Sequence, residues 1–162
     1  MAVITNLGVA PIKPSQVFGW EVNTDVGYGR ESFTITVPAG QVVRVGTILE
    51  LDYLAGTATV VDGASLTDAA AVEALGDLGV FVGRDLPTNP ATAADFERLE
   101  LAATGVGVAI VKGDGRGILK KGYLDLSGTQ YYGLPAAVQA ALDAKFTKEN
   151  RFKMVEQQYT LA

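Results

Sequence analysis

The sequence predicts a mainly β (α+β) fold: a small sandwich or barrel-like domain with one or two short helices and an extended N-terminal arm. Three observations predict it. Apolar residues occur mostly in short runs punctuated by glycine, of which the chain has 19, as is typical of β-rich domains. Residues 32–37 alternate strictly between apolar and polar side chains, as a half-buried strand does. Two stretches, 65–76 and 134–145, carry helix signals.

Residues 1–31 are predicted to form the extended arm, because Pro11, Pro14 and several glycines oppose a helix and regular strand pairing. A first pair of strands inside the domain is the alternative. Phe18 and Trp20 fit either a recognition hot spot or a core anchor at the base of the arm. The side chains expected to bind a partner through the arm are Val3, Ile4, Leu7, Val9, Ile12, Phe18 and Trp20.

Residues 32–145 are predicted to form the β-rich domain. Its central hairpin is expected within residues 37–61, where glycine marks two turns between short runs of aliphatic and β-branched residues. Residues 112–115 (KGDG) predict a second hairpin turn, from which the chain returns as a strand. Further strands are expected at 78–82, 106–111 and 118–126.

The helix expected at 134–145 has Pro135 in its first turn, where a missing N–H costs nothing. Its apolar residues recur with the spacing of one buried stripe. The stripe consists of Leu134, Ala137, Val138, Ala141 and Leu142, with Leu134, Val138 and Leu142 as its core members. The shorter helix at 65–76 is rich in alanine and needs tertiary contacts to persist. Residues 146–162 are expected to form a strand or an ordered tail.

The composition argues against an enzyme. The chain has no His and no Cys, which removes serine- and cysteine-type nucleophile–base pairs and the commonest metal ligands. Its carboxylates show no motif spacing, so they are interpreted as solvated surface. The glycine-rich run at 113–117 precedes a predicted strand rather than a helix, and therefore lacks the dipole of a phosphate site. No catalytic residue, cofactor or metal is expected.

Charge and hydropathy limit the partners. The net charge is −5 and the pI is about 4.7, and the one close basic cluster, Arg116, Lys120 and Lys121, is too small to track a phosphate backbone. Nucleic-acid binding is therefore not expected. No apolar stretch reaches the length of a membrane span, and the first residues lack the pattern of a signal peptide. Membrane binding is not expected either.

Four segments follow one another along the chain: AGQVVRVGTIL at Ala39 to Leu49, the strand from Gly79 to Asp85, the strand end from Ala109 to Gly113, and the helix from Leu134 to Leu142. In this order they resemble the lambda-type head decoration proteins of tailed phages. The resemblance covers roughly the middle two-thirds of the chain. The segment before Thr36 and the tail after Lys145 are longer than this family's pattern leads one to expect.

The resemblance implies a β-rich structural protein of the virion. Such a protein would be a homotrimer on the outer surface of the mature capsid, would bind the major capsid protein, and would stabilise the shell against the pressure of packaged DNA. Two alternatives stay open: another β-rich virion component such as a fibre or tail protein, and a barrel-sandwich carrier or binding module. A carrier would need a lysine presented at a tight turn, for which Lys112 is the nearest candidate.

Overall fold

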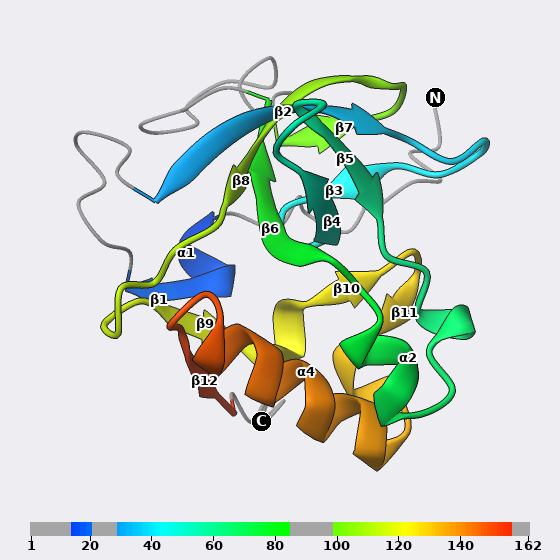
Figure 1. Cartoon of the computed structure of the whole chain (residues 1–162). Helices are drawn as coiled ribbons and strands as arrows, with labels where there is room; N and C mark the ends of the chain where they lie inside the picture. The colour runs from blue at the N-terminus through cyan, green and yellow to red at the C-terminus, as the bar shows by residue number, and fades with distance from the viewer. Residues whose placement is uncertain (1–13, 21–28, 85–98, 157–162) are drawn as a thin grey trace, which may run out of the picture.

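The computed structural model describes residues 14–20, 29–84 and 99–156. Its centre is a closed barrel in which the strands follow the order β2-β5-β4-β6-β8 and β8 pairs again with β2 (Figure 1). All neighbours are antiparallel except β2 and β5. The strands are β2 (Arg30–Thr36), β4 (Ile48–Asp52), β5 (Thr57–Val60), β6 (Asp77–Gly83) and β8 (Gly105–Ile110). The predicted mainly β, barrel-like fold is confirmed.

The barrel interior follows from the alternation of side chains along each strand. In β2, Phe33 and Ile35 point inward and are buried, while Thr34 and Thr36 face water. A Cβ on Gly107 would lie 2.6 Å from Ile35 Cδ1, so a larger residue at this position of β8 would have to displace core side chains. The interior side chains are Phe33, Ile35, Val43, Leu49, Leu51, Ala58, Phe81, Leu101, Ala109 and Val111.

A second core lies between the barrel and α4 (Ala136–Lys148). The predicted helix core is confirmed: Leu134 is 5% exposed, and Val138 and Leu142 are fully buried. Ala137, expected on the same stripe, is exposed. The shorter helix α2 (Ala69–Glu73) begins at Asp68, whose carboxylate accepts a hydrogen bond from the Ala71 N–H. Among the described residues, no helix is long and apolar enough to cross a membrane.

Short elements surround these two cores. A three-stranded sheet with the order β1-β9-β12 lies beside α4 (Figure 1), and two-stranded sheets join β3 with β7 and β10 with β11. The strands are β1 (Phe18–Trp20), β3 (Val43–Arg44), β7 (Glu100–Leu101), β9 (Ile118–Lys120), β10 (Asp125–Leu126), β11 (Thr129–Gln130) and β12 (Lys153–Val155). The helical turns are α1 (Pro14–Val17), η1 (Gly63–Ser65), η2 (Lys121–Tyr123) and η3 (Tyr131–Gly133).

The central hairpin predicted within residues 37–61 is confirmed as β4 and β5, which pair from Leu49↔Val60 to Asp52↔Thr57. The prediction of a hairpin at 112–115 is wrong. β9 pairs with β1 and β12 instead of returning along β8, because the turn packs on the C-terminal segment. The Gly113 N–H donates to Asn150 O, and a Cβ on Gly113 would lie 2.4 Å from Phe152 Cδ1.

Two predicted domain boundaries are also wrong. Residues 14–20 are not an extended arm, because they form α1 and β1 and contribute buried side chains. The C-terminal segment does not begin at 146, since α4 continues to Lys148 around the fully buried Phe146. The strand expected in that segment is present as β12, parallel to β9.

Candidate interaction surfaces

The segment Pro14–Trp20 is anchored in the domain. Val17 is fully buried and Phe18 is 6% exposed within the core beneath α4, while the backbone of β1 pairs with Ile118 and Leu119. Phe18 is therefore a core anchor, which decides between the two interpretations for this residue. Trp20 pairs with Ile118 through its backbone, and its side chain lies outside the described part of the structure. The predicted binding residues Val3, Ile4, Leu7, Val9 and Ile12 also lie outside the described residues.

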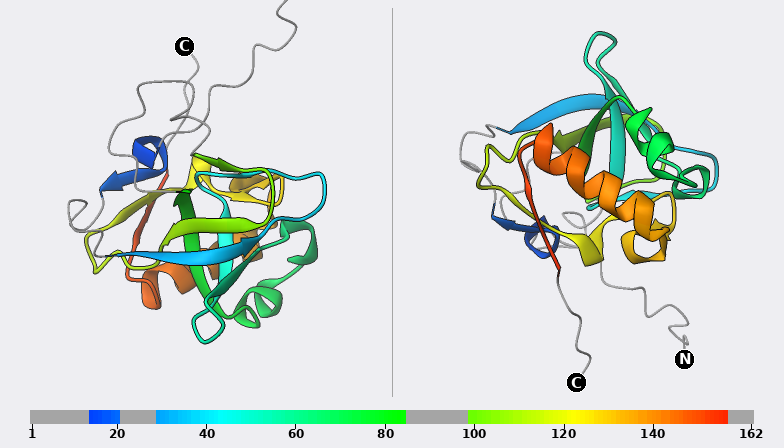
Figure 2. Two further views of the ribbon diagram at one scale, coloured as in Figure 1. Left: turned by 90° about the horizontal axis from the view of Figure 1, so that it is seen from above. Right: turned by 60° about the horizontal axis from the view of Figure 1, so that its bottom comes forward.

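The β4–β5 hairpin projects from the barrel (Figure 2). Two exposed side chains, Tyr53 and Leu54, lie at its turn. Asp52 Oδ1 accepts hydrogen bonds from the N–H groups of Leu54 and Ala55, both at 3.0 Å, and Gly56 takes the positive φ that closes the turn. Leu54 is fully exposed on this turn. Tyr53 is about half exposed, and its ring packs edge-on against Phe33 at 5.6 Å between centroids.

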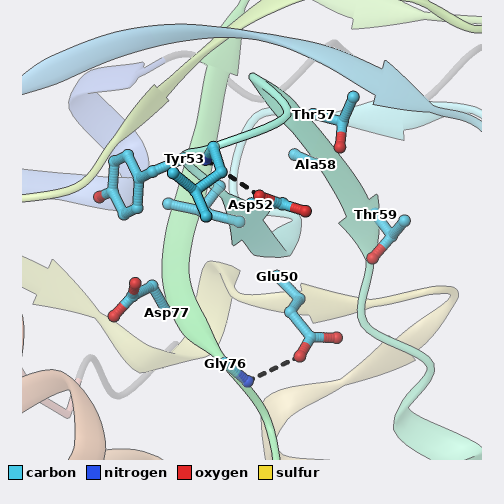
Figure 3. A pocket seen from close by; sticks show the side chains of 10 residues that line it. Glu50, Asp52, Tyr53, Thr57, Ala58, Thr59, Gly76 and Asp77 are labelled. Carbon is cyan, nitrogen blue, oxygen red and sulfur yellow. Dashed lines mark hydrogen bonds between the residues drawn. The ribbon is translucent and has the colours of Figure 1, made fainter.

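Carboxylates surround this turn. Glu50, Asp52 and Asp77 line an open hollow of about 560 Å³ together with Tyr53 and small or threonine side chains (Figure 3). Glu50 Oε1 accepts a hydrogen bond of 2.6 Å from the Gly76 N–H. Partial burial raises the pKa of Tyr53, and the negative charges of Glu31 and Asp77 raise this pKa further. The hairpin end of the barrel is therefore acidic around an apolar tip.

The opposite charge gathers at the turn after β8 and along β12. Arg151 Nη1 lies 3.4 Å from Asp114 Oδ1, and the Gly115 N–H donates to Arg151 O. The N–H of Lys153 donates to Gly117 O, which holds the start of β12 against the same turn. Arg116, Arg151 and Lys153 are exposed. We call these three residues the basic edge.

A second hollow, of about 540 Å³, lies between β3 and the loop from η2 to β11. It is lined by Arg44, Asp125, Ser127 and backbone groups. Burial raises the pKa of Asp125, although the Gly128 N–H and the charge of Arg44 favour its ionised form. The Oδ2 atom of Asp125 accepts the hydrogen bond from Gly128 at 3.1 Å.

Asp125→Asn is expected to stabilise the protein at neutral pH. A carboxyl whose folded pKa is raised binds protons more tightly in the folded state, so its contribution to stability falls as pH rises from its unfolded pKa through its folded pKa. Asparagine carries no charge to desolvate and keeps an oxygen for the Gly128 N–H. The melting temperature of the variant should exceed that of the parent at pH 7, and the difference should shrink near pH 3. An equal or larger gain at acidic pH would contradict this cause.

A network of polar side chains ties α4 to the loops beneath it. The Tyr131 hydroxyl lies 2.9 Å from Gln139 O and close to Asp143, which also pairs with Lys121. Burial is the first cause that raises the pKa of Tyr131, and its contact with Asp143 raises it further. These groups are satisfied by one another, so the network holds the helix in place. Sequence spacing gave no signal for it, because its members meet only in the fold.

In the described ranges, no three side chains of the metal-binding types converge on one point. Comparison with protein-family models, curated proteins and solved structures found no match. Two of the carboxylates of the hollow have structural partners: Asp52 holds the hairpin turn, and Glu50 accepts from the Gly76 N–H. The described surface has three features that suit contact with a partner: an apolar tip, an acidic end and a basic edge.

Proposed function

We propose that the chain is a capsid decoration protein of a tailed phage. In this proposal it binds the major capsid protein on the outer surface of the mature head as a homotrimer. It stabilises the shell against the pressure of the packaged DNA. The proposal assigns it no catalytic activity and no cofactor.

The observation that carries the proposal is the mutual placement of the four resembling segments. Ala39–Leu49 supplies β3 and the start of β4, and the segments from Gly79 and Ala109 supply most of β6 and the end of β8. β4 pairs with β6, and β6 pairs with β8. The segment Leu134–Leu142 lies mainly in α4, which packs on the same core. Segments that are far apart in the sequence thus form one contiguous unit, as a shared fold requires.

The Gly-Thr pair in the first segment also has a physical role. Gly46 takes a φ of +99°, and a Cβ there would lie 2.3 Å from Tyr123 O. Thr47 is buried, and its Oγ1 accepts a hydrogen bond from the Arg44 N–H while its own N–H donates to Arg44 O. The pair therefore makes the tight turn that leads from β3 into β4. The Gly-Thr pair of the motif therefore has a structural role in this fold.

The anchored N-terminal segment supports a gripping role for the residues before it. Val17 and Phe18 are held in the core. A partner that binds residues 1–13 would therefore be attached directly to the folded domain. Extended segments can bind a protein shell by adding a strand to an exposed sheet edge. Three copies would grip together, which raises the effective concentration of the second and third arms.

The carrier alternative is less well supported. A carrier lysine belongs at the tip of a hairpin, whereas Lys112 follows β8 in a turn that leads to a different sheet. A Cβ on Gly29 would lie 2.7 Å from Lys112 O, so the backbone here is closely packed. A fibre or tail protein remains the alternative within the same class, and the experiment below distinguishes it.

Purified protein is expected to bind expanded heads of its phage and not unexpanded ones. The physical reason is that expansion rearranges the capsid subunits and creates the sites that a late-binding protein needs. Co-sedimentation with heads of both kinds measures this directly. Equal binding to both kinds would contradict the dependence on maturation, and binding to neither would overturn the decoration proposal in favour of another virion role.

A further inference from the structure

We propose that copies of this chain associate head to tail, with the acidic hairpin end of one copy on the basic edge of the next. The hairpin end comprises Glu31, Glu50, Asp52 and Asp77 around the exposed Tyr53 and Leu54. The basic edge comprises Arg116, Arg151 and Lys153. This inference takes only the number of copies, three, from the proposed function. The contact itself is argued from the two surfaces.

The hairpin tip has the features of a surface that another molecule covers in an assembly. Fully exposed Leu54 stands beside half-exposed Tyr53 on a turn held by two hydrogen bonds, so the two side chains form one apolar tip that a second surface can cover. Tyr53 is fixed beside it by its contact with Phe33. Little conformational entropy would be lost when a second surface covers the tip, which favours binding.

The negative charges of the hairpin end determine which kind of surface can bind there. No ion pair within the described residues neutralises Glu31, Glu50, Asp52 or Asp77. Two hairpin ends would therefore repel each other, which disfavours a symmetric tip-to-tip dimer. The partner surface must carry positive charge beside an apolar patch. A second copy offers this on its own basic edge.

The basic edge meets both requirements. Arg116 and Lys153 make no ion pair in the described part of the chain, and Arg151 has only the long contact with Asp114. Half-buried Met154 and Val155 continue the strand that carries Lys153. β12 pairs with β9 on one side only in the described sheet. The edge therefore combines cations, apolar side chains and an open strand edge.

The two surfaces are separate enough to be used at the same time. The hairpin projects from one side of the barrel, and β12 lies well away from it in each view (Figures 1 and 2). A contact between two different surfaces passes from copy to copy and closes into a ring when the rotation between copies fits. With the three copies of the proposed function, every hairpin end and every basic edge would be occupied.

The test is a charge-reversal cycle on the full chain, with the molar mass followed by light scattering across protein dilutions. Asp77→Lys and Lys153→Glu are each expected to weaken association about tenfold, and the double variant should recover affinity to within about threefold of the parent. Raising salt from about 0.05 M to about 0.5 M should weaken the parent more than either single variant.

Glu73→Lys on α2 makes the same change in net charge outside the hairpin end, and should weaken association clearly less than Asp77→Lys. Glu31→Lys serves as the hairpin-end variant if Asp77→Lys proves unfolded by circular dichroism. A monomeric parent, single variants that associate normally, or a double variant without recovery would each overturn the inference. Head binding by the parent is measured separately, so a head-to-tail ring that fails to bind heads would overturn only the decoration proposal.

Discussion

Val138→Asp is expected to unfold the protein or to lower its melting temperature by roughly 10 °C or more. Val138 is fully buried in the cluster of apolar side chains between α4 and the barrel. An unpaired carboxylate there loses its hydration and leaves the space of a lost methyl group poorly filled. A cost of about 4 kcal/mol is a large part of the total stability of a single domain. Thermal unfolding followed by circular dichroism measures the change.

Ala140→Asp is the matched control, because Ala140 lies on the exposed face of the same helix. It introduces the same charge and loses more helix propensity than Val138→Asp does, but its carboxylate stays in water. The control should melt within a few degrees of the parent. Similar melting temperatures for the two variants would contradict the burial of the predicted helix stripe.

Local patterns predicted the elements whose burial follows directly from their own sequence. The alternation from Phe33 to Thr36 is the burial pattern of β2. Val138 and Leu142 lie on the buried face of α4, and Leu134 is buried just before the helix begins. In both cases one side of the element faces a core along its whole length. A periodic sequence then contains enough information to identify both the element and its inner face.

The errors lie where distant contacts decide the outcome. Residues 112–115 do contain a turn, with Asp114 and Gly115 at positive φ, but the strand that follows joins β1 and β12 because Phe152 packs against Gly113. Phe18 likewise is buried by residues more than 25 positions away. No local rule encodes such pairings.

Local sequence patterns do not predict the interaction surfaces either, because these surfaces also depend on distant contacts. Glu31, Asp52 and Asp77 are scattered in the sequence, and were interpreted as ordinary solvated charge. Only the closure of the barrel brings them together around Tyr53. Gly56, two residues after Leu54, predicts a hairpin turn, but not that this leucine stands fully exposed.

Deletion of residues 1–13 is expected to abolish binding to expanded heads while leaving the domain folded. The cut falls just before α1, so Val17 and Phe18 keep their places in the core and β1 keeps its pairing with β9. The melting temperature should therefore change little. Head binding should be lost, because the deletion removes all five apolar residues assigned to the grip that precede the anchor, namely Val3, Ile4, Leu7, Val9 and Ile12.

Deletion of residues 157–162 provides the comparison, since it also removes a terminal segment beyond the described domain and follows an anchored strand, β12. Co-sedimentation with expanded heads should retain this second variant and lose the first. If both variants bind heads normally, the grip belongs to the folded domain, and the exposed hairpin end becomes the surface to test next. If both lose binding and stay folded, the shell is held at two ends of the chain. If only the first variant loses head binding, the residues that precede Pro14 bind the shell. Val17 and Phe18 then anchor this binding segment in the core of the domain.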